Sequence, residues 1–187
     1  PTTEEFIIHT PTESARKEYI GNAARHGRLA TVFAQLAING EEYGVHAFLV
    51  PIRTADGAPM PGVRIEDNGD KLGLNGVDNG RLWFDQVRVP RTALLNRFAD
   101  VTPEGEYQSP ITGEAKRFFT MIGTLVAGRI GIATSALSAA KSGLTIAIRY
   151  AAQRRQFGNP GQPETLLLDY QTRQRRLLPL VANAYAL

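Results

Sequence analysis

The chain has 187 residues, enough for one complete domain or for one domain and part of a second. Apolar residues make up 43% and charged residues 21%, which is typical of a soluble globular protein and argues against disorder. Because the chain has no cysteine, disulfides, thiolate metal sites and cysteine nucleophiles are excluded. Its three histidines, His9, His26 and His46, are scattered, so we expect no metal site.

The pattern of charge excludes some functions and favours others. Apolar runs of 18 residues without a charge are missing, and so is a basic start followed by an apolar stretch, so we expect no membrane span and no targeting signal in this segment. Residues 1–110 carry 11 Lys/Arg against 15 Asp/Glu, a net charge of −4, whereas residues 111–187 carry 10 against 3, a net charge of +7. The second part is therefore expected to attract anions such as a phosphate-rich ligand, a nucleic acid or an acidic partner.

The first part of the chain has the pattern of short antiparallel strands. Gly, Pro, Asn and Asp separate stretches of alternating apolar and polar residues, without helical patterns between them. This spacing predicts an antiparallel sandwich or barrel. The predicted strands are 6–9, 29–36, 45–50, 63–66, 81–84 and 86–89.

Two segments in this first part contain residues that allow close backbone approach. Tyr19 precedes Gly21, so an aromatic ring is followed by a glycine beside which a planar ligand can fit. The same pair is also commonplace at strand ends. The glycine-rich run 73–80 lacks the Lys-Ser/Thr and the following helix of a phosphate-binding loop, so we interpret it as turn chemistry.

The second part has a helical period. Apolar and small residues recur at steps of three or four from Phe118 to Ala151, which predicts one long helix, and the pattern breaks at residues 157–161. A second helix is expected from about Pro163 towards the end, with a kink or interruption at Pro179. Since the pattern has no stop signal at the end and two helices cannot cover their own apolar faces, we expect a fragment of a larger helical bundle.

Three arginine-containing features are candidate binding groups in this second part. Arg129 lies in the apolar stripe of the long helix, where a guanidinium needs a structural carboxylate partner, an anionic ligand, or a place near the helix edge from which it reaches water. Arg154, Gln156 and Phe157 follow the end of that helix and could grip a phosphate and an adjacent ring. The alternative for Arg154 is that it only stabilises the helix C-terminus.

Read together, these segments resemble the acyl-CoA dehydrogenase superfamily, and in particular its acyl-CoA oxidase branch. The resemblance is ordered along the chain. It is carried by Lys17-Glu-Tyr-Ile-Gly-Asn22, by the strand pair within 40–53, by the strand within 78–90, and by the helical segments 146–158 and 168–180. It implies an α+β fold, with an antiparallel β-barrel-like middle domain over residues 1–110 and the start of a C-terminal helical domain over residues 111–187.

The resemblance also implies a function and a set of binding residues. The enzyme would use FAD to oxidise a fatty acyl-CoA to its trans-2-enoyl thioester, with oxygen as acceptor and hydrogen peroxide as product. Tyr19 and Gly21 would lie beside the isoalloxazine. Arg154, Gln156 and Phe157 would reach the pyrophosphate and adenosine of an FAD bound mainly by a neighbouring subunit of a homodimer, and Arg129 would lie near the acyl-CoA.

The catalytic base of the family is not expected in this segment, because Ala127 and Gly128 stand beside Arg129 where some dehydrogenases have a glutamate. We therefore expect the segment alone to be inactive. The location would be cytoplasmic in a bacterium and peroxisomal in a eukaryote. Three alternatives remain open: a dehydrogenase that passes electrons to a flavoprotein, a non-catalytic scaffold, and a nucleic-acid binder suggested by Arg173, Arg175 and Arg176.

Overall fold

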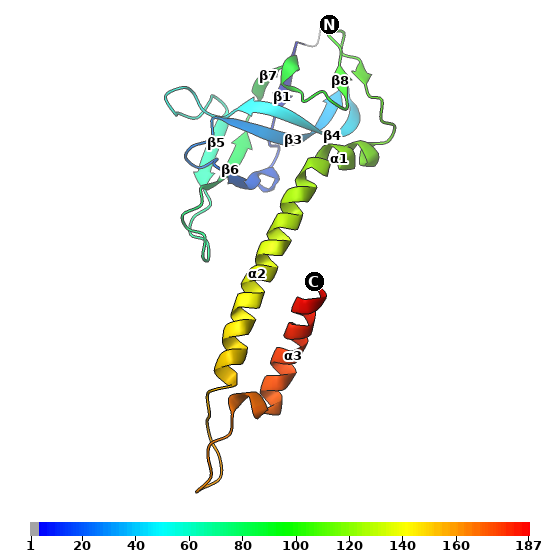
Figure 1. The fold of residues 1–187 in the computed structure, drawn as a ribbon. Helices are drawn as coiled ribbons and strands as arrows, with labels where there is room; N and C mark the ends of the chain where they lie inside the picture. The colour runs from blue at the N-terminus through cyan, green and yellow to red at the C-terminus, as the bar shows by residue number, and fades with distance from the viewer. Residues whose placement is uncertain (1–3) are drawn as a thin grey trace. The chain divides into compact units, whose positions relative to one another are not determined.

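The computed structural model describes residues 4–187, and the chain divides into two compact units, Pro1–Met121 and Ile122–Leu187. The first unit is built mainly of β-strands and ends within a short helix, and the second is built mainly of helices, as Figure 1 shows. The α+β prediction is therefore confirmed. The strands are β1 (Glu5–Ile8), β2 (Lys17–Gly21), β3 (Leu29–Ile38), β4 (Glu41–Pro51), β5 (Val63–Asp67), β6 (Asn79–Phe84), β7 (Val87–Pro90), β8 (Asp100–Val101) and β9 (Tyr107–Gln108).

Every strand pair in the first unit is antiparallel. Within the described residues 4–187 the pairs form four small sheets, ordered β1-β7, β2-β6-β5, β3-β4 and β8-β9. A closed barrel needs each strand to pair on both sides, and among residues 4–187 only β6 does so. The prediction of an antiparallel β-domain is therefore confirmed, and among residues 4–187 its sheets do not close into a barrel.

Alternation along the strands builds one apolar core in the first unit. Along β1 and β7, buried and exposed residues follow each other one by one, so that one face of each strand is buried. The ring of Phe6 meets that of Phe48 edge to face, with the ring centroids 5.2 Å apart. Phe48 and Phe84 are the largest fully buried side chains, and their burial holds β4 and β6 against the core.

A buried polar cluster ties β4, β9 and the start of the first helix together. Nδ1 of His46 lies 3.0 Å from the carbonyl oxygen of Gly44, and Nε2 lies 3.0 Å from the hydroxyl of Tyr107. Because the carbonyl can only accept, Nδ1 carries the hydrogen and Nε2 accepts from Tyr107. Arg117 is buried and donates to the carbonyl of Tyr43. Burial lowers the pKa of His46, and the nearby Arg117 charge adds to this lowering, while the Gly44 carbonyl and Glu114 oppose it.

Helices make up most of the second unit. The helices of the chain are α1 (Glu114–Ile122), α2 (Val126–Ala151) and α3 (Gln171–Ala186), and the short 3₁₀ turns are η1 (Glu13–Ala15), η2 (Arg91–Ala93), η3 (Gly123–Leu125) and η4 (Leu167–Asp169). Figure 1 shows that α3 returns alongside α2 in the opposite direction. The predicted start near Pro163 was wrong, because residues 164–167 pair with residues 154–157 before the helix begins.

Pro179 lies inside α3, which runs unbroken from Gln171 to Ala186. Of the predicted kink or interruption, the interruption is therefore excluded. A proline removes one N–H donor and displaces the carbonyl four residues earlier, here that of Arg175. Arg175 is exposed, so water can take up the released carbonyl.

The hydroxyl groups of α2 bond to the helix itself. All five serine and threonine side chains of this helix donate to the carbonyl four residues earlier, over 2.8 to 3.1 Å. They are Thr134, Ser135, Ser138, Ser142 and Thr145.

Large apolar side chains remain exposed on the helical unit. Among them are Ile130, Ile132 and Ile146 of α2 and Leu178 and Tyr185 of α3. By length and composition, the helical stretch Glu114–Ala151 could cross a membrane, but the core helix of a soluble protein meets the same criteria, so this is weak evidence. Such uncovered faces are expected of helices that belong to a larger bundle.

Candidate cofactor-binding site

The sequence-predicted binding residues fall into two groups, one in each unit. In the first unit, Tyr19 and Gly21 both belong to β2, which is an edge strand because it pairs only with β6 among the described strands. The Tyr19 side chain is 64% exposed, and a Cβ placed on Gly21 would meet nothing within 4 Å. The strand therefore presents an aromatic ring and open space to a planar ligand.

The turn after Gly21 is held by a carboxylate. Oδ1 of Asp78 accepts from the backbone N–H of Ala24 (3.0 Å), and Oδ2 accepts from those of Arg25 (3.2 Å) and His26 (3.1 Å). The Asp78 side chain is only 9% exposed. Burial by itself raises the pKa of this carboxyl, but the bonds from His26, Arg25 and Ala24 outweigh it, and the pKa is lowered. Asp78 is therefore ionised and fixes the backbone of the turn.

A guanidinium holds the same turn through its carbonyls. Arg53 donates to the carbonyls of Ala23, Ala24 and Gly27, each over 2.8 Å. The turn from Asn22 to Gly27 is thus clamped between a carboxylate that takes its N–H groups and a guanidinium that takes its carbonyls. This arrangement keeps the exit of β2 rigid.

Gly80 of β6 makes room for this turn. A Cβ at Gly80 would lie 2.6 Å from the backbone nitrogen of Ala24 and 2.9 Å from the carbonyl carbon of Ala23. Only glycine therefore fits without a shift of the turn. Sequence reasoning treated this glycine as part of a turn-forming run and missed Asp78, although the Asp-Asn-Gly order at 78–80 was visible.

The second group lies in a paired loop after α2. Leu167 donates to the carbonyl of Arg154 (2.9 Å), Gln156 to that of Thr165 (3.0 Å) and Thr165 to that of Phe157 (2.7 Å). The Tyr170 hydroxyl donates to the carbonyl of Gln156 over 2.7 Å. Arg154, Gln156 and Phe157 are therefore brought together on one short antiparallel ladder.

The two adjacent arginines of this ladder differ in what they do. Nη1 of Arg155 donates to the carbonyl of Glu164 over 2.8 Å, so this side chain has a structural role. The Arg154 side chain is exposed, and within residues 4–187 its guanidinium makes no hydrogen bond or ion pair. Phe157 is 71% exposed and has a left-handed backbone, with φ at 60°. Arg154 and Phe157 thus keep a donor fork and a ring face open for a ligand.

Arg129 is exposed on α2, as are Leu125 and Ala133, which precede and follow it in the stripe. Within the described helical unit, no segment covers that part of α2. Its side chain has no ion pair within residues 4–187 and is open to an anionic ligand or to a carboxylate partner.

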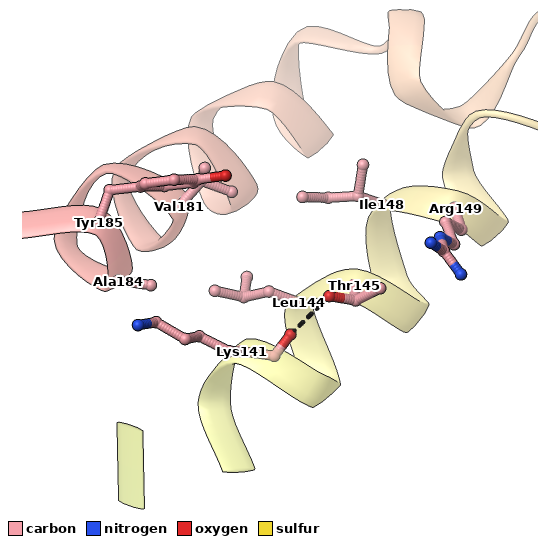
Figure 2. A pocket seen from close by; sticks show the side chains of 8 residues that line it. All are labelled: Lys141, Leu144, Thr145, Ile148, Arg149, Val181, Ala184 and Tyr185. Carbon is pink, nitrogen blue, oxygen red and sulfur yellow. Dashed lines mark hydrogen bonds between the residues drawn. The ribbon is translucent and has the colours of Figure 1, made fainter. Parts of the chain in front are cut away.

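A groove of about 540 Å³ lies between α2 and α3. In Figure 2, Leu144 and Ile148 of α2 project towards α3, from which Val181 and Tyr185 extend into the same space. Lys141 and Arg149 also line this groove. The helical unit therefore combines an apolar groove with cationic groups, as its net positive charge indicates.

Comparisons with known proteins agree along the whole chain. Residues 122–187 match the family model described as acyl-CoA oxidase, C-alpha1 domain. The peroxisomal acyl-coenzyme A oxidase 3 of Arabidopsis thaliana is 54% identical over 188 residues, which cover 100% of this chain and 28% of that protein.

Solved structures give the same result. Acyl-CoA oxidase 1 of Arabidopsis thaliana superposes with a TM-score of 0.82 at 42% identity, over 98% of this chain and 28% of that one. Acyl-CoA oxidase-2 of Caenorhabditis elegans, solved with FAD, ascaroside-CoA and ATP, has a TM-score of 0.80 at 39% identity, over 98% of this chain and 27% of that one. The chain thus spans little more than a quarter of the proteins it matches.

Proposed function

We propose, from the premise that this chain belongs to the acyl-CoA oxidase family, that its protein oxidises a fatty acyl-CoA to the trans-2-enoyl-CoA in fatty acid β-oxidation. The observation that carries the proposal is the 54% identity to an acyl-CoA oxidase over the whole chain. FAD, when bound, supplies the hydride acceptor and passes the electrons to oxygen, which gives hydrogen peroxide. The relatives favour this oxidase reaction over a dehydrogenase that uses a flavoprotein acceptor.

In this proposal β2 lies beside the isoalloxazine. The exposed ring of Tyr19 would pack near it, and the empty space at Gly21 allows the backbone to pass close by. The role of this chain here is to hold a planar group against a rigid strand edge. The clamp of Asp78 and Arg53 on the following turn suits that role.

The ladder after α2 would bind the other end of the cofactor. The open guanidinium of Arg154 would bind the pyrophosphate, and Gln156 and Phe157 would contact the adenosine. As in the resemblance described above, this FAD would be bound mainly by a neighbouring subunit, so we propose a homodimer. These residues fit FAD chemically, since the guanidinium of Arg154 can donate to the pyrophosphate and the ring of Phe157 can pack against the adenine.

Arg129 would lie near the acyl-CoA, where its charge suits an anionic or polar part of the substrate. No residue of this chain is proposed as the base that removes the α-proton. The 187-residue chain alone is accordingly expected to be inactive. For a eukaryotic source we propose a peroxisomal location, which the name of the Arabidopsis relative supports. For a bacterial source we propose the cytoplasm.

The test is a stopped-flow assay on the full-length protein. Its bound flavin is reduced without oxygen by palmitoyl-CoA and then mixed with air-saturated buffer. Fast reoxidation with one peroxide per flavin is expected. Reduction with sluggish reoxidation would instead identify a dehydrogenase, and a flavin that palmitoyl-CoA and shorter acyl-CoAs leave oxidised would identify a scaffold. Salt-sensitive duplex DNA binding by a flavin-free protein would identify a nucleic-acid binder.

A further inference from the structure

The backbone of β2 is irregular at Tyr19. Lys17 pairs with Leu82 and Ile20 pairs with Gly80, so Glu18 and Tyr19 together face the single residue Arg81. This is a β-bulge, a feature that re-aims a side chain and occurs often beside active sites. Tyr19 has φ at 55°, a left-handed conformation that is unfavourable for a residue with a Cβ. Neighbouring groups must therefore hold it.

Two asparagine side chains hold both polar groups of the Tyr19 backbone. The N–H of Tyr19 donates to Oδ1 of Asn68 over 3.3 Å, and Nδ2 of Asn79 donates to the carbonyl of Tyr19 over 3.2 Å. The backbone N–H of Asn68 donates to the carbonyl of Asn79 over 3.1 Å, which ties the two together. We call Asn68 and Asn79 the asparagine bracket.

The residues that follow the bulge are held by Asp78, which directly precedes β6. Asn22 is also left-handed, with φ at 62°, and its N–H donates to the carbonyl of Asp78 over 2.9 Å. The carboxylate of Asp78 then takes the N–H groups of the next turn. Asn68, Asp78 and Asn79 thus determine the path of the chain from Tyr19 onwards.

The hydrogen bonds of the asparagine bracket are unusual because they hold the backbone of an exposed residue. Tyr19 is an exposed aromatic residue, so its ring gains little from the apolar core, yet its backbone is held by side chains from two separate segments. A strained backbone that surrounding groups maintain indicates a functional constraint on the side chain it directs.

We propose that Asn68 and Asn79 are positioning residues, which maintain the bulge so that the Tyr19 ring is directed at the flavin. This rests on the proposed function. The two asparagines act through the backbone of Tyr19 and do not themselves touch the cofactor.

The experiment uses the full-length holoenzyme and reads the fluorescence and absorption of the bound flavin, because an aromatic ring stacked on a flavin quenches its emission. Asn79→Ala is expected to raise flavin emission and to weaken FAD binding about 5- to 10-fold, as the loss of one hydrogen bond implies. Asn68→Ala, which removes the acceptor on the other side, is expected to act in the same direction. Asn96→Ala is the matched control, because Asn96 is exposed and makes only a 3.4 Å contact to Asp100.

A second measurement separates positioning from general stability. Tyr19→Gly removes the ring and relieves the left-handed strain. If the bracket acts through the Tyr19 ring, Asn79→Ala added to Tyr19→Gly leaves the flavin emission where Tyr19→Gly alone puts it. An equal effect of Asn79→Ala in both backgrounds would overturn the proposal, as would bracket variants that match the Asn96→Ala control. A wild-type protein without flavin would refute the proposed function itself, and the bracket proposal with it.

Discussion

Gly80→Ala is the substitution for which the structure gives the clearest magnitude. Ordinary contact begins at about 3.4 Å, and a Cβ at this position would lie 2.6 Å from the Ala24 nitrogen, so the turn must move by about 0.8 Å. Such a movement would stretch the 3.0 Å bond between Ala24 and Asp78 beyond hydrogen-bond length. Overpacking costs ~1–3 kcal/mol and the lost bond ~1 kcal/mol, so we expect a loss of about 2–4 kcal/mol in the free energy of unfolding.

The assay follows from the single tryptophan of the chain. Trp83 lies in β6, three residues after Gly80, and is 8% exposed. Its fluorescence therefore reports unfolding of the first unit during urea denaturation. Gly76→Ala is the matched control: its Cβ would meet nothing within 4 Å, so we expect unchanged stability or a gain of up to ~1 kcal/mol. If Gly80→Ala unfolded at the same urea concentration as Gly76→Ala, the steric reasoning would be refuted.

Three further predictions concern titration and the loop after α2. Since the pKa of His46 is lowered, its neutral form stabilises the folded state fully above the unfolded pKa of 6.5, and this stabilisation is lost as the pH falls below that value. The urea midpoint of the wild type should therefore fall over this pH range, and the midpoint of His46→Gln should not show this part of the fall. The pKa of Asp78 is also lowered, so its contribution is present above 3.8 and disappears as pH falls below it. Asp78→Asn should lower the urea midpoint at pH 7 while the exposed control Asp70→Asn should not, and equal midpoints would contradict the clamp. Tyr170→Phe leaves the Gln156 carbonyl unpaired and should cost ~0.5–1.5 kcal/mol, with faster amide exchange at Thr165 and no change in the Trp83 signal.

The strands with regular burial were the easiest part of the fold to predict. β1 and β7 alternate between buried and exposed residues, and both were predicted to within one residue at each end. β2 was missed because the bulge at Tyr19 breaks its alternation and its residues are mostly exposed. The start of α3 was misplaced because the ladder between residues 154–157 and 164–167 pairs two segments without an apolar pattern.

The candidate site was only partly visible in the sequence. Tyr19 and Gly21 were identified by resemblance to a family, and their role stays a prediction. Asp78, Arg53 and the asparagine bracket act on backbone groups far away in the sequence, over separations of up to 60 residues. No local sequence pattern predicts such contacts, since the sequence does not distinguish an asparagine or aspartate that binds a distant backbone group from one that faces water.

The self-bonded hydroxyls of α2 change how this helix should be compared with its relatives. A hydropathy scale counts Ser138 and Ser142 as polar, yet each hydroxyl already has its acceptor within the helix. Burial of these two serines would leave neither hydroxyl without a hydrogen-bond acceptor, so the free-energy cost of removing water from them is small. Serine and alanine also differ little in volume. Substitution of serine by alanine, or the reverse, along α2 is therefore expected to change protein stability little. A helix with polar serines of this kind can also be packed against other segments on every side.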